Sequence, residues 1–137
     1  ASQLIVSLQQ IISRNCNPFS PSVLSICAIQ GGNSTNIIPS EVRLMGTFRA
    51  MDEAWRFKAH ELIKKQTQEL IQAMGATAYV HIDVGYPVLF NNEKLTDTAW
   101  QLAKDYLGEM QVEETEMRMG AEDFSYYTHQ IPGCFFR

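Results

Sequence analysis

Residues 42–49 read Val-Arg-Leu-Met-Gly-Thr-Phe-Arg, and Asp52 follows just before a long helical pattern. Apolar residues and glycine occupy the even positions, and the odd positions include Arg43 and Arg49. Successive side chains of a strand point to opposite faces, so this alternation predicts a half-buried strand with a basic outer face. Asp52 is a good N-cap residue, so we expect a helix to begin directly after the strand.

The patterns on either side of this junction complete one order of elements. Residues 2–14 carry apolar side chains at helical spacing, and residues 23–29 are apolar enough for a buried strand. The helix after Asp52 should end at Gly75, and residues 79–84 alternate again as a strand does. The predicted order is therefore helix, strand, strand, helix, strand. It matches a ferredoxin-like split βαβ unit, of class α+β, without its first strand (α-β-β-α-β).

The pattern changes after Pro87. We expect a helix from Asn92 to Gly108, a short strand near residues 110–116, a short helix over 121–129 and an apolar strand at the end of the chain. About 50 residues with two helices are too few for a confident independent core. We therefore divide the sequence into a ferredoxin-like domain, residues 1–86, and an incomplete α/β domain, residues 87–137. The apolar end also predicts that the chain is a piece of a longer protein.

Composition narrows the classes of function. The 137 residues hold 11 Lys and Arg against 15 Asp and Glu, a net charge of −4, which argues against nucleic acid as a partner. No apolar run reaches 18 residues, so we expect no membrane span. Cys16, Cys27 and Cys134 lie too far apart for a zinc motif. We interpret them as reduced, buried thiols of a cytoplasmic protein.

Several polar residues invite a chemical interpretation beside a structural one. His81 and Asp83 share a strand face and suit one metal ion, but no third ligand lies nearby, so an exposed polar face is favoured. Asn36 follows a glycine-rich turn and can simply hold that turn. Arg49 is either solvated or grips a carboxylate with its planar fork. Glu122 has a sufficient structural role at a helix N-terminus.

Four motifs together resemble a known family. They are Gly-Gly-Asn-Ser-Thr-Asn-Ile-Ile-Pro (31–39), Gly-Thr-Phe-Arg (46–49), Gly-Tyr-Pro (85–87) followed by Asn91, and Met-Gly-Ala-Glu-Asp-Phe-Ser-Tyr-Tyr (119–127). In this order they resemble the metallopeptidases of family twenty. The later motifs are typical of its amidohydrolase branch, which hydrolyses N-acyl amino acids and hippurate. The resemblance covers essentially the whole chain.

The resemblance implies roles for three residues. Asn36 would contact substrate, often in the partner subunit's site, Arg49 would grip the substrate carboxylate, and Glu122 would lie in a substrate-binding loop at the rim of the cleft. It also implies that residues 1–86 are the lid, which forms a homodimer. Two divalent metal ions, zinc, manganese or similar, would be held outside this chain, which supplies neither metal ligands nor catalytic residues. The predicted parent is thus a metal-dependent amidohydrolase, and the 137 residues alone are expected to be inactive.

A second hypothesis comes from a different class of protein. A ferredoxin-like sheet also occurs in non-catalytic dimerisation or small-ligand-binding modules, and fold does not fix function. The two hypotheses differ in their need for metal ligands in flanking sequence.

Overall fold

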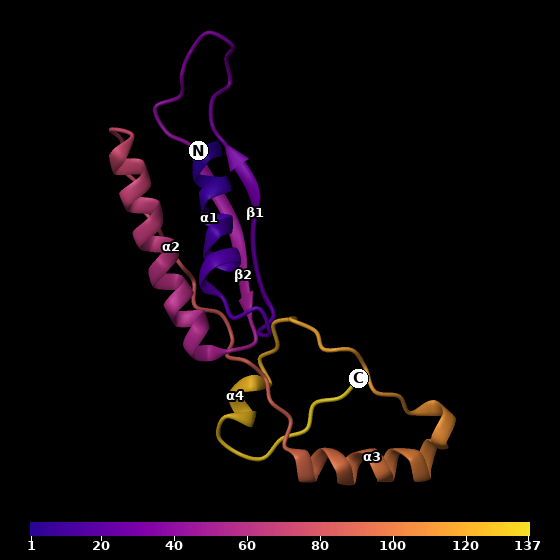
Figure 1. The fold of residues 1–137 in the computed structure, drawn as a ribbon. Helices are drawn as coiled ribbons and strands as arrows, with labels where there is room; N and C mark the ends of the chain where they lie inside the picture. The colour runs from indigo at the N-terminus through magenta and orange to yellow at the C-terminus, as the bar shows by residue number, and fades with distance from the viewer. The chain divides into compact units, whose positions relative to one another are not determined.

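The computed structural model describes residues 1–137 and divides them into two compact units, Ala1–Asp83 and Val84–Arg137. The first unit contains α1 (Ser2–Asn15), β1 (Ser22–Gln30), β2 (Arg43–Ala50) and α2 (Glu53–Ala73) (Figure 1). The second contains α3 (Glu93–Leu107), the 3₁₀ helix η1 (Glu109–Gln111) and α4 (Ser125–Thr128). The chain is therefore of class α+β, as predicted. No helix is long and apolar enough to cross a membrane.

The sheet of the first unit has two antiparallel strands. β1 and β2 pair from Ser22 opposite Ala50 to Gln30 opposite Arg43, with a bulge between Ile26 and Ala28. The alternation predicted for β2 is confirmed, because the side chains of its inner face are half-buried and those of its outer face are exposed. β1 is a strand as predicted, but it is not a buried one, since Leu24 is its only buried residue.

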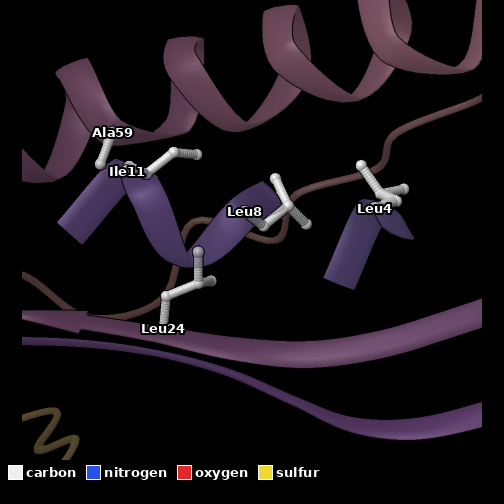
Figure 2. Packing of buried hydrophobic residues seen from close by; sticks show 5 residues of the cluster. All are labelled: Leu4, Leu8, Ile11, Leu24 and Ala59. Carbon is white, nitrogen blue, oxygen red and sulfur yellow. The ribbon is translucent and has the colours of Figure 1, made fainter. Parts of the chain in front are cut away.

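The core of the first unit is small and lies where α1 meets α2 and β1. Leu4, Leu8 and Ile11 of α1 form a stripe that faces Ala59 of α2 and Leu24 of β1 (Figure 2). Ile11 and Ala59 have no exposed surface. The helical spacing of apolar residues in the sequence thus predicted the buried face of α1 correctly.

Both ends of α2 follow the predicted capping chemistry. The Asp52 carboxylate accepts a hydrogen bond of 2.6 Å from the Trp55 N–H. Gly75 adopts φ +76° and donates to the Gln72 carbonyl at 3.0 Å, while Ala76 donates to the Ile71 carbonyl at 3.1 Å. This pair of bonds is the Schellman arrangement, which requires a left-handed residue that glycine supplies without strain.

The strand predicted over residues 79–84 is wrong. Val80 and Ile82 are half-buried and His81 is exposed, so the alternation of faces is present, but this segment pairs with no strand. In a split βαβ arrangement another strand separates the two strands that a helix connects. The neighbour of residues 79–84 would therefore be the first strand of that fold, and the chain has no strand before α1.

Two more predicted strands, in the second unit, are also wrong. Residues 110–116 contain part of η1 and no strand, and the last residues, 134–137, do not enter a sheet. The helix expected over 121–129 is confined to α4, Ser125–Thr128. A strand must bond to a neighbouring strand, and the second unit contains none.

The helix predicted after Asn92 is confirmed as α3. The Asn92 side chain accepts from the Leu95 N–H at 3.1 Å, and Gly108 ends the helix with φ +94°. Its apolar residues Leu102 and Tyr106 are exposed, and α3 contains no buried residue.

The three cysteines are free thiols, as expected, but the prediction that all are buried is wrong. Cys27 is exposed at the bulge of β1, since the extra residue of a bulge is left out of the regular alternation. Cys16 and Cys134 are half-buried.

Gly46 is required by the packing of β1 on β2 beside the bulge. A Cβ atom there would overlap the Ser25 carbonyl oxygen and lie 2.9 Å from Ile26 Cδ1. We predict that Gly46→Ala lowers the free energy of unfolding by about 1–3 kcal/mol, as overpacking does. Urea unfolding followed by circular dichroism measures this. Gly85→Ala is the control, because nothing lies within 4 Å of its added Cβ; equal stability of the two variants would contradict the prediction.

Candidate functional site

Arg49 lies at the end of β2, on the outer face of the hairpin. It is exposed and stands opposite Val23, with Thr47 and Ser25 as the next cross-strand pair on the same face. The side of the sheet that carries the core is the other one. Arg49 therefore lies on an exposed face of the sheet, and the planar fork of an arginine suits the binding of a carboxylate.

The corner between β2 and α2 fixes this end of the strand. Phe48 packs edge-to-face against Trp55, with the ring centroids 6.5 Å apart. The Trp55 indole N–H donates to the Ser22 hydroxyl at 2.9 Å, so the first turn of α2 is joined to the start of β1. Arg49 thus extends from a strand end that is held on its inner side by ring packing and a hydrogen bond.

His60 completes the packing around Phe48. Its ring lies 5.9 Å from the Phe48 ring and 5.9 Å from the Phe57 ring, edge-to-face in both cases. Burial lowers the pKa of His60, and the charges of Arg56 and Lys64 lower it further, against a smaller opposing effect of Glu53. The folded protein therefore favours the neutral imidazole at this position.

Asn36 lies in the loop of residues 31–42 that connects the two strands, and the whole loop around it is exposed. Its side-chain oxygen accepts a hydrogen bond of 2.6 Å from the Ser34 hydroxyl. This contact supports the structural interpretation of Asn36 as a residue that holds the turn. The side-chain NH₂ group stays available as a donor to a ligand.

The structure does not bring Asn36 and Arg49 together. The loop leaves the sheet beyond Gln30 and Arg43, whereas Arg49 lies at the opposite end of β2 (Figure 1). Arg43, where the loop rejoins the sheet, is six residue steps of about 3.3 Å from Arg49, about 20 Å in all. This is too far for both side chains of one copy to touch one small substrate.

Glu122 belongs to the second unit and lies one turn before α4. Its backbone carbonyl, not its carboxylate, makes the local contacts, because it accepts from the Ser125 hydroxyl at 2.6 Å and from the Ser125 N–H at 3.2 Å. The expected placement of the carboxylate at the helix N-terminus is therefore wrong. The carboxylate lies 3.8 Å from the Arg137 guanidinium, and 27% of the side chain is exposed.

His81 and Asp83 bond to each other and to no third ligand. His81 Nε2 lies 2.8 Å from Asp83 Oδ1, and both side chains are mostly exposed. No group of three or more His, Cys, Asp or Glu residues in the chain is placed to hold a metal ion. The interpretation as an exposed polar pair is confirmed, and the residues present do not fit a metal centre.

Sequence reasoning gave no role to two residues that organise the second unit. The Asn91 side chain donates to the Phe135 carbonyl at 2.9 Å and accepts from the Phe135 N–H at 2.8 Å. His129 Nε2 lies 2.9 Å from the Val88 carbonyl. The signal for Asn91 was its place in the third motif, since hydrogen bonds across 44 residues leave no local pattern.

The two later motifs meet in the second unit. Tyr86, from the Gly-Tyr-Pro motif, packs edge-to-face on Tyr126 with ring centroids 5.7 Å apart. This contact brings together two motifs that lie far apart in the sequence.

The family model that matches this chain is described as peptidase family M20/M25/M40, and it matches residues 10–137. The chain belongs to this family. It is 36% identical to N-acetyl-L-cysteine deacetylase of Bacillus subtilis over 98% of the chain and 32% of that protein. It is 31% identical to the IAA-amino acid hydrolase ILR1-like 2 of Arabidopsis thaliana over 98% of the chain and 31% of that protein.

A solved structure agrees with these relatives. It is assigned as an aminohydrolase of methicillin-resistant Staphylococcus aureus, and the TM-score is 0.76 at 27% identity, over 96% of this chain and 34% of that one. The predicted family and its amidohydrolase branch are thus confirmed. The chain spans about a third of the length of the curated relatives it matches.

The lowered pKa of His60 predicts a pH-dependent stability. The folded state binds a proton at His60 less readily than the unfolded chain does. The contribution of neutral His60 to the free energy of unfolding is therefore complete above the usual histidine pKa of about 6.5. It is lost as the pH falls from there toward the folded-state value, by at most about 1.4 kcal/mol per pH unit. Urea unfolding at pH 7.5 and 5.5 should show a larger drop for wild type than for His60→Gln. Equal drops would refute the prediction.

Proposed function

We propose that the full-length protein is a metal-dependent amidohydrolase that cleaves the amide bond of N-acyl amino acids, with this chain supplying substrate binding and dimerisation. The family membership and the hydrolase relatives support the reaction class. The observation that supports the substrate class is the exposed position of Arg49 at a strand end where Phe48 packs on Trp55. A free carboxylate is what distinguishes an N-acyl amino acid from a simple amide.

In this proposal Arg49 binds the amino acid carboxylate through two parallel N–H···O bonds. Such a pair of bonds fixes the orientation of the substrate as well as its affinity. The scissile amide of an N-acyl amino acid lies one carbon from its carboxylate, so fixing the carboxylate also fixes the amide. Arg49 therefore acts as a binding residue whose geometry sets the position of the reacting bond.

The distance between Asn36 and Arg49 supports a homodimer. If both side chains contact one substrate, they must come from two copies of the chain, because Asn36 lies in the loop beyond Arg43, and Arg43 is already about 20 Å from Arg49. We propose that residues 1–86 form the ferredoxin-like lid through which two copies pair, and that residues 87–137 are part of the catalytic domain. Asn36 of one copy then completes the site to which the other copy contributes Arg49.

Enzymes of this family generally use divalent metals, and the residues of this chain do not fit a metal centre. We propose that two divalent ions, zinc, manganese or similar, are held by other parts of the full-length protein. Glu122 is proposed as a substrate-binding residue, and the cytoplasm as the location.

Arg49→Ala in the full-length enzyme should raise KM for an N-acyl amino acid by about tenfold to a hundredfold, as loss of a charge-assisted bond does. Steady-state kinetics on an N-acyl amino acid and on its methyl ester measure the effect, which should shrink for the ester. Arg43→Ala is the matched control, since Arg43 lies on the same face at the far end of β2. An unchanged kcat/KM for Arg49→Ala rejects the assigned role. Absence of turnover by wild type loaded with metal would favour a non-catalytic binding module.

Mixed dimers test whether the site is shared between copies. Asn36→Ala and Arg49→Ala homodimers should both be weakened. A dimer formed from one copy of each should recover about half of the wild-type activity, because one of its two sites then holds both native side chains. Purified mixed dimers carrying two different tags provide the measurement. Recovery no better than that of the separate variants shows that both residues do not serve one shared site.

A further inference from the structure

Asn91 uses its whole side-chain amide on one backbone position. The NH₂ group donates to the Phe135 carbonyl at 2.9 Å, and the oxygen accepts from the Phe135 N–H at 2.8 Å. The amide thus bonds to Phe135 as a neighbouring strand would. The backbone of the adjacent Asn92 donates to the Gly133 carbonyl at 2.8 Å, so residues 133–135 are held at two points.

Phe135, held in this way, packs against the segment that contains Glu122. Its ring packs against Phe124, with centroids 5.7 Å apart and the planes tilted by 36°. Phe124 is the residue directly before α4 and lies two positions after Glu122. Ring contact therefore fixes the turn that carries the Glu122 carboxylate.

A second set of contacts also connects Phe135 with the Glu122 carboxylate. The Arg137 guanidinium lies over the Phe135 ring, 5.6 Å from its centroid, and 3.8 Å from Glu122 Oε2. The latter distance allows attraction between charges but is too long for a hydrogen bond. The nearby charge thus orients the carboxylate without a direct hydrogen bond to Arg137. The carboxylate is exposed enough to accept a hydrogen bond from a ligand.

We propose that Asn91 is a positioning residue that orients the Glu122 carboxylate toward the substrate, acting through the backbone and ring of Phe135. This inference rests on the proposed function, in which Glu122 binds substrate. Asn91 itself touches no reacting atom. Its contribution is to keep the carboxylate in the orientation that binding requires, so it affects recognition more than the chemical step.

The first experiment compares Asn91→Ala with wild type in the full-length enzyme loaded with metal. We expect KM for an N-acyl amino acid to rise about tenfold while kcat stays close to wild type, as for loss of one or two hydrogen bonds. In a Glu122→Gln background the same substitution should have little further effect on KM. Asn92→Ala is the matched control, because it removes the cap of α3 but leaves the Asn91 bonds in place.

The conservative variant Asn91→Asp supplies a pH signature. A protonated Asp can donate to the Phe135 carbonyl and accept from its N–H, whereas an ionised carboxylate can only accept and repels the carbonyl oxygen. The ratio of KM for Asn91→Asp to KM for wild type should therefore fall as the pH is lowered toward the usual Asp pKa of about 3.9. The same ratio for Asn91→Ala should stay constant.

The outcomes separate the two proposals. Turnover by wild type with an unchanged KM in Asn91→Ala, or an equal rise in KM in the Glu122→Gln background, overturns the positioning role alone. A wild-type enzyme with no turnover of N-acyl amino acids overturns the proposed function. Hydrogen exchange at the Phe135 amide detects the hydrogen bonds of Asn91 independently of enzymatic turnover. Unchanged protection of this amide in Asn91→Ala would also overturn the inference.

Discussion

The packing of Phe48 at the corner between β2 and α2 determines the geometry of the first unit. Only Met51 and Asp52 separate the strand from the helix, so the helix must fold back over the inner face of the sheet as soon as it begins. The Asp52 cap starts it there, and Trp55 and His60 then close around the Phe48 ring. Because this contact occupies the inner face, Arg49 is directed to the outer face.

The antiparallel hairpin places a second constraint on function. One end of the hairpin carries the connecting loop and the other carries the corner with α2, so residues at these two ends cannot meet within one copy. A site that uses both ends must be built from two copies, or each end must serve a different ligand. These two alternatives follow from the length of the strands, which keeps the two ends apart, and not from any detail of the side chains.

The sequence predicted the three long helices and the caps of α2 and α3 well, because these depend on neighbours in the chain. The apolar stripe with Ile11, the Asp52 cap and the left-handed Gly75 all follow from spacings of a few residues. The strand pattern over 79–84 was equally clear, yet no strand forms, since strand formation depends on a partner elsewhere. Local alternation predicts which face of a segment is apolar. It does not predict whether a neighbouring strand is present to which the segment can hydrogen-bond.

The same distinction explains what could be predicted of the candidate site. Arg49 was placed on an exposed strand face from alternation alone, and the structure agrees. The distance from Asn36 depends on the register of the whole hairpin, which no local motif encodes.

The second unit shows how a segment without a sheet obtains order from side chains. Asn91 and His129 bond to backbone groups 44 and 41 residues away, which a strand partner would otherwise satisfy. Ser125 is fully buried and uses its hydroxyl on the Glu122 carbonyl, so it closes the turn before α4 from within. Each of these bonds is specific to one side chain, whereas the bonds of a sheet are made by any residue except proline. The structure of the second unit therefore depends more strongly on single motif residues than that of the first unit, because changing one residue removes side-chain hydrogen bonds that join two distant segments.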